Sequence, residues 1–195
     1  MNEYNQNPFP IEDHHALAAK WLKLLLYVCL ASIGCSLLNL IPILSVVAGW
    51  GSTAVSVALV YVLFQLAPSN ARYRKAAIFR CVVLVAGLLA ENLLSLVISV
   101  CSIVAMYQEY MGHSEITASR APALSDKWHS LFNIQLIVGV LSAVTSSAGV
   151  MIGVLAGMGS DALVGIIVFV MSVIGIGLNL LYLHYLNQTV KLYEE

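Results

Sequence analysis

The stretch 76–106 constrains this chain most, because it is almost continuously apolar yet carries two adjacent polar residues, Glu91 and Asn92, near its middle. A helix rises about 1.5 Å per residue, so one of this length would reach roughly 45 Å. That exceeds the hydrocarbon core of a bilayer, which is about 30 Å thick. A carboxylate at the centre of such a helix is costly unless it is protonated, paired or facing water. We therefore expect the fold to give Glu91 a partner or a wet cavity.

The composition places most of the chain in lipid. Hydrophobic residues make up 60% of the sequence and charged residues 10%, whereas a soluble domain carries about 25% charged residues. The net charge of -1 excludes a broadly basic surface for nucleic acid. The four cysteines all lie in apolar runs, where they are expected to pack as free thiols and not to form a disulfide framework.

Apolar runs divided by polar or proline-containing turns predict an all-α integral membrane protein, a bundle of five transmembrane helices. We expect a polar tail over 1–19, a single transmembrane domain over 20–186 and a polar tail over 187–195. Residues 107–127 are predicted to form a polar loop. The predicted spans cover 21–41, 44–66, 76–106, 128–156 and 161–186. A four-span arrangement with one re-entrant hairpin is the alternative.

Five spans would put the two termini on opposite sides of the membrane. The positive-inside rule then favours a cytoplasmic N-terminus, in the cell (inner) membrane, because that side would hold six of the nine Lys and Arg residues. These six are Lys20, Lys23, Arg72, Arg74, Lys75 and Arg80. The last four form the densest basic cluster, whose expected role is to set topology, with anionic lipid headgroups as an alternative partner. The apolar hairpins 24–66 and 136–186 would then be inverted, which leaves an inverted duplication as a further hypothesis.

Polar and small residues within the predicted spans have two interpretations each. Glu91 either binds a proton or cation, or acts as a neutral group that ties helices together, which is the interpretation we favour. Gly149, Gly153 and Gly157 lie at four-residue spacing, which lets another helix approach closely, from within the chain or from another subunit. The candidate partners of Glu91 are Asn39, Gln135, Ser142, Thr145, Ser146, Ser147 and Asn179. The hydroxyl residues among them either line a polar path or bond back to their own helix.

The predicted loop holds Glu109, His113 and Glu115, whose oxygen and nitrogen donors could bind a metal together with Asp126 or His129. A solvated loop is the interpretation that we favour. We expect no cofactor and no metal.

The sequence contains no Walker motif, GxSxG elbow or HExxH pair, which disfavours an enzyme. The sequence favours a non-enzymatic helper or subunit that packs with itself or with another membrane protein through small-residue helix faces. The alternative is a small ion- or proton-coupled transporter or channel that uses Glu91. The expected surroundings are the lipid bilayer, without nucleic acid.

Overall fold

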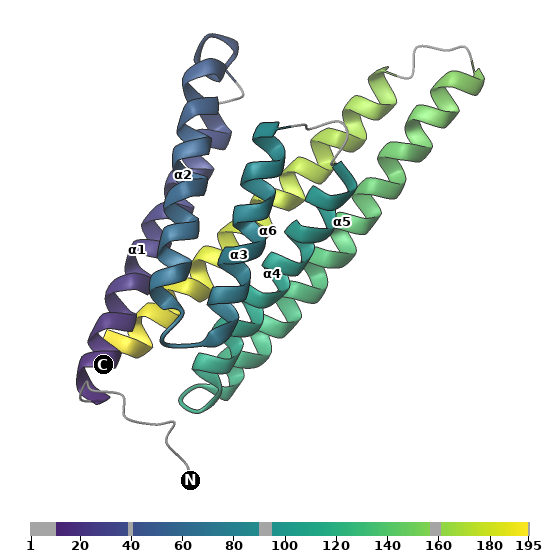
Figure 1. Ribbon diagram of the computed structural model, residues 1–195. Helices are drawn as coiled ribbons and strands as arrows, with labels where there is room; N and C mark the ends of the chain where they lie inside the picture. The colour runs from purple at the N-terminus through teal and green to yellow at the C-terminus, as the bar shows by residue number, and fades with distance from the viewer. Residues whose placement is uncertain (1–10, 39–40, 90–94, 157–160, 195) are drawn as a thin grey trace.

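The computed structural model describes residues 11–38, 41–89, 95–156 and 161–194, and the elements in these ranges are all helical. Figure 1 labels six α-helices, and a short 3-10 turn, η1 (Pro42–Leu44), precedes the second of them. In chain order the helices are α1 (Ile11–Leu38), α2 (Ser45–Leu66), α3 (Ala71–Leu89), α4 (Ser95–Ala118), α5 (Pro122–Ala156) and α6 (Asp161–Glu194).

The six helices run up and down as three hairpins, α1–α2, α3–α4 and α5–α6 (Figure 1). Each helix packs against the next along the chain, and α6 packs back against α1. The order of contacts is therefore a closed ring. Short connections explain this order, because they leave consecutive helices as antiparallel neighbours.

Both described ends of the chain lie at the same end of the bundle, which we call the terminal end; the opposite one is the far end (Figure 1). Lys23 of α1 and Glu194 of α6 form an ion pair of 2.9 Å there. The turns α2–α3 and α4–α5 lie at the terminal end as well, so Arg120 and Lys127 join the basic cluster of α3 on that side. The prediction that the termini lie on opposite sides is wrong, because the described residues form six α-helices that alternate in direction. Because α1 and α5 both start at the terminal end, their hairpins are not inverted.

Four of the helices are long and apolar enough to cross a membrane, with candidate spans Ala16–Leu38, Ser45–Leu66, Pro122–Thr145 and Phe169–Glu194. This supports an all-α, multi-pass membrane protein, but not a bundle of five spans. The expected single helix over 76–106 is instead divided between α3 and α4, with 90–94 outside the described residues.

Local sequence signals account for two of the helix starts. Asn70 caps α3, because its Oδ1 accepts a hydrogen bond of 2.8 Å from the backbone N–H of Arg72. Pro122 is the first residue of α5, where a missing N–H costs nothing. Helix α1 already begins at Ile11 and α6 continues to Glu194. Helix therefore extends into both predicted polar tails, over 11–19 and 187–194.

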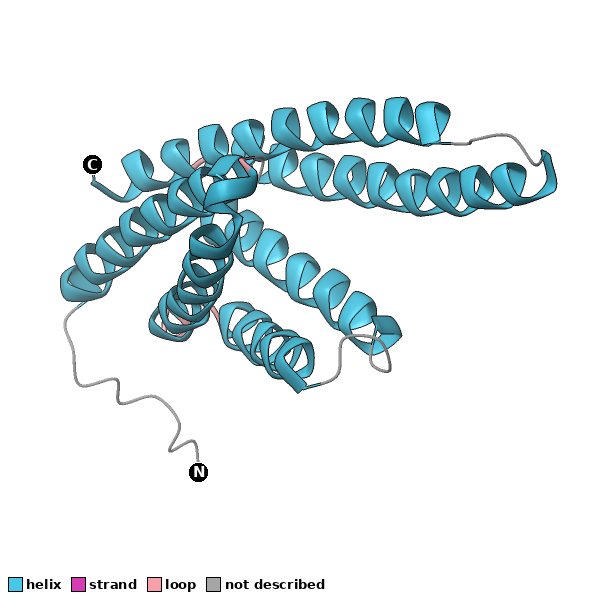
Figure 2. Cartoon of the chain, turned by 90° about the horizontal axis from the view of Figure 1, so that it is seen from above, coloured by secondary structure: helices cyan, strands magenta, loops and turns pink. Residues whose placement is uncertain are grey.

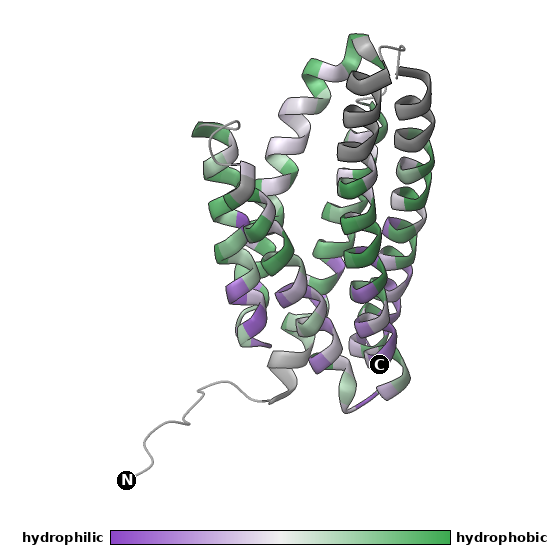
Figure 3. Ribbon diagram, turned by 90° about the vertical axis from the view of Figure 1, so that its right-hand side faces the viewer, coloured by the Kyte–Doolittle hydropathy of each residue, from purple (hydrophilic) through white to green (hydrophobic). Residues whose placement is uncertain are grey.

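The described core lies in the half of the bundle near the terminal end. Its fully buried side chains include Leu22, Leu25, Leu63, Leu66, Tyr73, Trp128, Leu131 and Leu186. Toward the far end α1–α2 and α5–α6 diverge, as Figures 1 and 2 show. In Figure 3 hydrophilic residues gather near the terminal end and hydrophobic ones continue above them. The six helices thus pack tightly at one end and spread apart at the other.

Candidate functional site

A cavity of about 320 Å³ lies in the middle of the ring and is lined by side chains from all six helices. Its volume is at the lower end of the range for small-molecule sites. Helix α3 contributes Arg80 and α4 contributes Glu109. The other polar lining residues are Cys29, Ser32, Ser102, Tyr110, Gln135, Asn179 and Tyr182. The cavity therefore offers polar side chains from five of the six helices, whereas α2 contributes only Val55 and Leu59.

The charged floor of the cavity is an ion pair between Arg80 and Glu109. The Arg80 Nε and Nη2 groups both donate to Glu109 Oε2, at 3.0 and 2.6 Å. The Glu109 side chain is 2% exposed and that of Arg80 is 32% exposed. An isolated carboxylate at this depth would be strongly disfavoured, so Arg80 is the group that lets Glu109 remain charged there.

A chain of hydrogen bonds leads from Glu109 toward the terminal end. Tyr182 donates its hydroxyl to Glu109 Oε1 at 2.6 Å, and His113 Nε2 lies 3.3 Å from the same hydroxyl. At the opposite edge of the imidazole, His113 Nδ1 lies 2.8 Å from the Tyr73 hydroxyl. Because the Tyr182 proton is directed at Glu109, we assign the Nε2–H tautomer, in which Tyr73 donates to Nδ1. Tyr73, His113, Tyr182 and Glu109 thus form one continuous chain of hydrogen bonds.

Aromatic rings hold this chain in place. The His113 ring stacks on Trp128 with 4.5 Å between centroids, and Tyr182 meets Trp128 edge-on at 5.3 Å. Trp128 is fixed in turn, because its Nε1–H donates to Thr189 Oγ1 at 3.2 Å. Tyr110 donates to Gln135 at the cavity wall. Since His113 and Tyr73 are fully buried, the chain is shielded from solvent at its Tyr73 end, whereas Glu109 and Tyr182 line the cavity.

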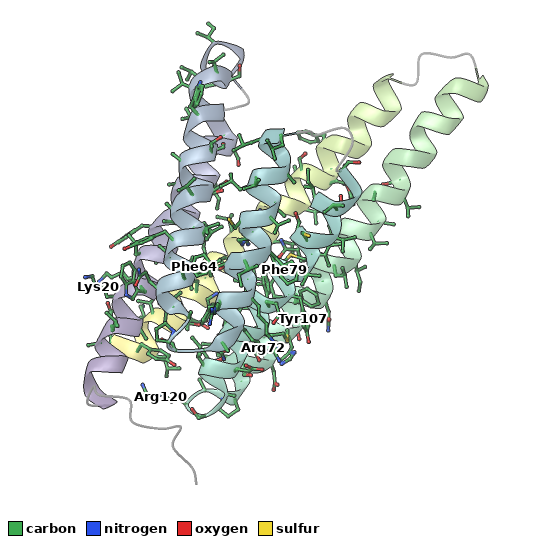
Figure 4. The ribbon with its side chains drawn as sticks, viewed as in Figure 1. Lys20, Phe64, Arg72, Phe79, Tyr107 and Arg120 are labelled. Carbon is green, nitrogen blue, oxygen red and sulfur yellow. The ribbon has the colours of Figure 1, made fainter. Side chains whose placement is uncertain are left out.

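A second polar cluster, outside the cavity, lies at the terminal end. Arg72 Nε donates to Glu115 Oε1 at 2.6 Å, and the Asn70 amide donates to Glu115 Oε2 at 2.9 Å. Arg72 also lies over the ring of Tyr107, at 5.8 Å from its centroid (Figure 4). Desolvation raises the pKa of Glu115, but these hydrogen bonds outweigh it and hold the pKa below its ordinary value. The cluster ties α3 to α4 beside the α2–α3 turn.

Most of the predicted intramembrane site lies beyond the described residues. Glu91, Asn92, Asn39 and Gly157 are outside them, and Gly149 and Gly153 fall in the part of α5 whose side chains are not described. Asn179 is described: it lines the central cavity and donates to the Gly175 carbonyl at 2.9 Å.

The hydroxyl and basic residues separate into different roles. Thr145 bonds back to the Leu141 carbonyl at 2.8 Å and does not line the cavity, which confirms the back-bonded interpretation at this position. Within the basic cluster, Arg74 and Lys75 are exposed. Arg72 and Arg80 instead form ion pairs within the bundle. The four cysteines are free, as expected.

The expected polar loop over 107–127 is wrong, because α4 continues to Ala118 and α5 starts at Pro122. Glu109 and His113 are buried, and Ser125, inside α5, hydrogen-bonds to Ser114 at 2.7 Å. A signal for this helix is present in the sequence, since Glu109, His113 and Thr117 recur every four residues and share one helical face. Within the described residues, no group of three or more His, Cys, Asp or Glu side chains has the geometry of a metal site.

The fold and this network define a multi-pass helical membrane protein with a polar cavity inside its helix ring. Comparison with protein-family models, curated proteins and solved structures finds no significant match for the chain.

Proposed function

We propose that this protein is a small proton-coupled membrane transporter in which Glu109 carries the coupling proton. The observation that carries the proposal is the cavity lined by all six helices, whose floor holds a buried acid at the end of a hydrogen-bonded chain. Buried ionisable residues inside membrane bundles commonly mark ion and proton pathways. This geometry favours the transporter class over the subunit class, and Glu109 over Glu91 as its acid.

The proposed orientation follows from the distribution of charge. Eight of the nine Lys and Arg residues belong to the parts of α1, α3, α5 and α6 near the terminal end or to the α4–α5 turn, and the ninth, Arg80, lies midway along α3. The connections 39–44, 90–94 and 157–160 contain neither residue. By the positive-inside rule, the terminal end faces the cytoplasm of a cell or inner membrane. We further propose that the α3–α4 hairpin enters the bilayer beside the four candidate spans.

In this orientation the divergent far end faces outward, and the Arg80–Glu109 floor closes the cavity on the cytoplasmic side. A solute would enter from outside and meet the amide of Asn179 and the hydroxyls of Ser32 and Ser102 before the ion pair. Because Arg80 compensates Glu109, the floor is close to neutral and suits a small polar or zwitterionic solute. Protonation of Glu109 would weaken its pair with Arg80. In the assigned tautomer every hydrogen bond of the chain points toward Glu109, so return of the proton through Tyr182, His113 and Tyr73 would require these bonds to reverse and the buried Tyr73 to gain access to water.

Cysteine accessibility tests whether the cavity is wet. Ser102 and Ile103 are adjacent on α4 and both exposed, but only Ser102 lines the cavity. In a chain without its native cysteines, Ser102→Cys is expected to react with a small hydrophilic thiol reagent added outside intact cells. Ile103→Cys, which would face lipid, is the matched control and is expected to stay unreacted. An unreactive Ser102→Cys would contradict the transport proposal.

Proton flux tests the role of Glu109. In proteoliposomes with an internal pH dye and an imposed potassium diffusion potential, the wild type is expected to admit protons faster than empty liposomes. Glu109→Gln and His113→Gln are each expected to lower that rate at least tenfold. Glu115→Gln, which changes an exposed acid on the same helix, is the control and should leave the rate unchanged. Equal rates for wild type and Glu109→Gln would refute proton coupling through this residue.

We retain a helper or subunit role as the second candidate, because one observation favours it. A Cβ built at Gly139, Gly175 or Gly177 meets no atom within 4 Å, so these glycines are not used for close contacts inside the bundle. Such positions allow another helix to approach. Gly139→Leu would then dissociate an oligomer in mild detergent while the monomer stays folded, and an unchanged oligomeric state would contradict this role.

A further inference from the structure

Helix α3 carries two adjacent cations near the terminal end that no carboxylate of the described residues neutralises. Arg74 and Lys75 lie in its first two turns, beside the α2–α3 turn, and both are exposed. The ion pairs within the described part of the chain use other cations, namely Lys23, Arg72 and Arg80. Two positive charges therefore remain available to an anion at this position.

The face of α3 that begins at these cations continues as an aliphatic stripe. Ile78, Val82, Val85 and Leu89 are all exposed. They recur at spacings of four, three and four residues, which places them on one face of the helix. Arg74 lies four residues before Ile78 and belongs to the same face. Since α3 packs mainly against α2 and α4, the stripe forms an outer surface of the bundle.

The length of the stripe matches one leaflet of a bilayer. Ile78 and Leu89 are eleven residues apart, which is roughly 16 Å along a helix axis. Half of the hydrocarbon core is about 15 Å thick. Side chains lean toward the N-terminus of their helix, which for α3 is the terminal end, and long cationic side chains extend their charge to the headgroup layer. The face therefore offers cations at headgroup depth and aliphatic groups through the leaflet beside them.

We propose that this face of α3 binds a phospholipid with an anionic headgroup, its phosphate at Arg74 and Lys75 and its acyl chains along the stripe. The uncompensated cations select the head, because clustered Lys and Arg residues at a membrane surface attract anionic lipids. The aliphatic stripe selects a lipid over a free phosphate ion. The site goes beyond transport and does not depend on it; it rests on the proposed insertion of the α3–α4 hairpin in the bilayer.

Native mass spectrometry of the purified protein in detergent tests the proposal, because it resolves each bound lipid by its mass. Phosphatidylglycerol is expected to bind at a concentration at least tenfold lower than phosphatidylcholine with the same acyl chains. A large molar excess of inorganic phosphate should not displace it. Equal binding of the two lipids would overturn the proposal, and so would displacement by phosphate, which would show a site for the free ion.

Two double variants that remove the same charge locate the site. Arg74→Gln, Lys75→Gln is expected to weaken phosphatidylglycerol binding at least tenfold. Lys127→Gln, Lys191→Gln, which removes two exposed cations from α5 and α6, is the matched control and should bind like the wild type. Equal loss in both variants would show only diffuse attraction to the whole basic surface and would overturn the proposal. That result would leave the transport proposal standing, since the flux of Glu109→Gln tests the latter independently.

Discussion

Removing one partner of the Arg80–Glu109 pair perturbs the centre of the structure directly. Arg80→Gln deletes two hydrogen bonds, of 3.0 and 2.6 Å, to a carboxylate that is 2% exposed. Loss of one partner from a buried pair costs about 3–5 kcal/mol. Because the Arg80 side chain is 32% exposed, the pair is not fully desolvated, and we expect the lower end of that range, about 3 kcal/mol.

The opposite change should cost less. Glu109→Gln leaves a guanidinium that is partly exposed and keeps a side chain that can accept from it, so we expect about 2 kcal/mol. The double variant leaves no unpaired charge. It should therefore cost about 2 kcal/mol as well, well short of the roughly 5 kcal/mol that additivity would give.

The measurement is a double-mutant cycle on the free energy of unfolding, from a denaturing-detergent titration followed by helical circular dichroism. The Lys23–Glu194 pair is the control: its side chains are 50% and 45% exposed, so solvent screening should make its coupling energy much smaller than that of the buried pair. Additive effects of Arg80→Gln and Glu109→Gln, with a coupling energy no larger than that of the control pair, would refute a buried charged pair.

Three further predictions follow from the same structure. Gly112→Ala places a Cβ 3.1 Å from Tyr73 Cε1, and because Tyr73 is fully buried we expect destabilisation by about 1–3 kcal/mol. The control, Gly139→Ala, meets nothing within 4 Å and should be neutral or stabilising by up to about 1 kcal/mol. Equal melting temperatures for the two variants would contradict this packing. Tyr73→Phe leaves His113 Nδ1 without the donor that lies 2.8 Å away, so the unfolding free energy should fall by about 1–3 kcal/mol, whereas Tyr27→Phe, at a side chain 55% exposed, should leave it unchanged. The pKa of Glu115 is lowered in the folded state, so its contribution is present above the ordinary value of 4.5 and is lost as the pH falls through the folded pKa. Glu115→Gln should then lower stability slightly at pH 7 and progressively less as the pH falls below 4.5. A variant equally destabilised across this range would show that ionisation is not involved.

The sequence predicts that the helices lie in lipid better than it predicts where the chain turns between them. Apolar runs identify α1, α2, α5 and α6, and Asn70 marks the start of α3 by its side chain. Periodicity alone cannot place the turn between α3 and α4, because the sequence on both sides of Glu91 is equally apolar. Because this turn was missed, the sequence predicts five helices where the described residues form six. The prediction therefore places the C-terminus on the wrong side of the bundle.

That missed turn also explains why the buried network was not predicted. If residues 76–106 formed one helix, Glu109 and His113 would lie in a solvated loop on the other side of the membrane. Arg80 would then lie near the lipid headgroups. The polar composition around Glu109 and His113 supports that assignment, but their four-residue spacing supports a helical face. The partners Tyr73 and Tyr182 come from positions 40 and 69 residues away from His113. The first pair depends on the packing of α3 against α4 and the second on the packing of α6 against α4, neither of which a local pattern encodes.

We propose that the six described helices form a ring in which the turns α2–α3 and α4–α5 lie on the same side of the membrane. Ser69 and Ser119 are exposed residues at these two turns, so Ser69→Cys and Ser119→Cys, each in a chain without its native cysteines, measure the claim directly. With an impermeant thiol reagent added outside intact cells, both variants are expected to be protected, and both should react fully once the cells are permeabilised. Labelling of one position and protection of the other in intact cells would contradict the six-helix arrangement and restore an odd number of crossings between them.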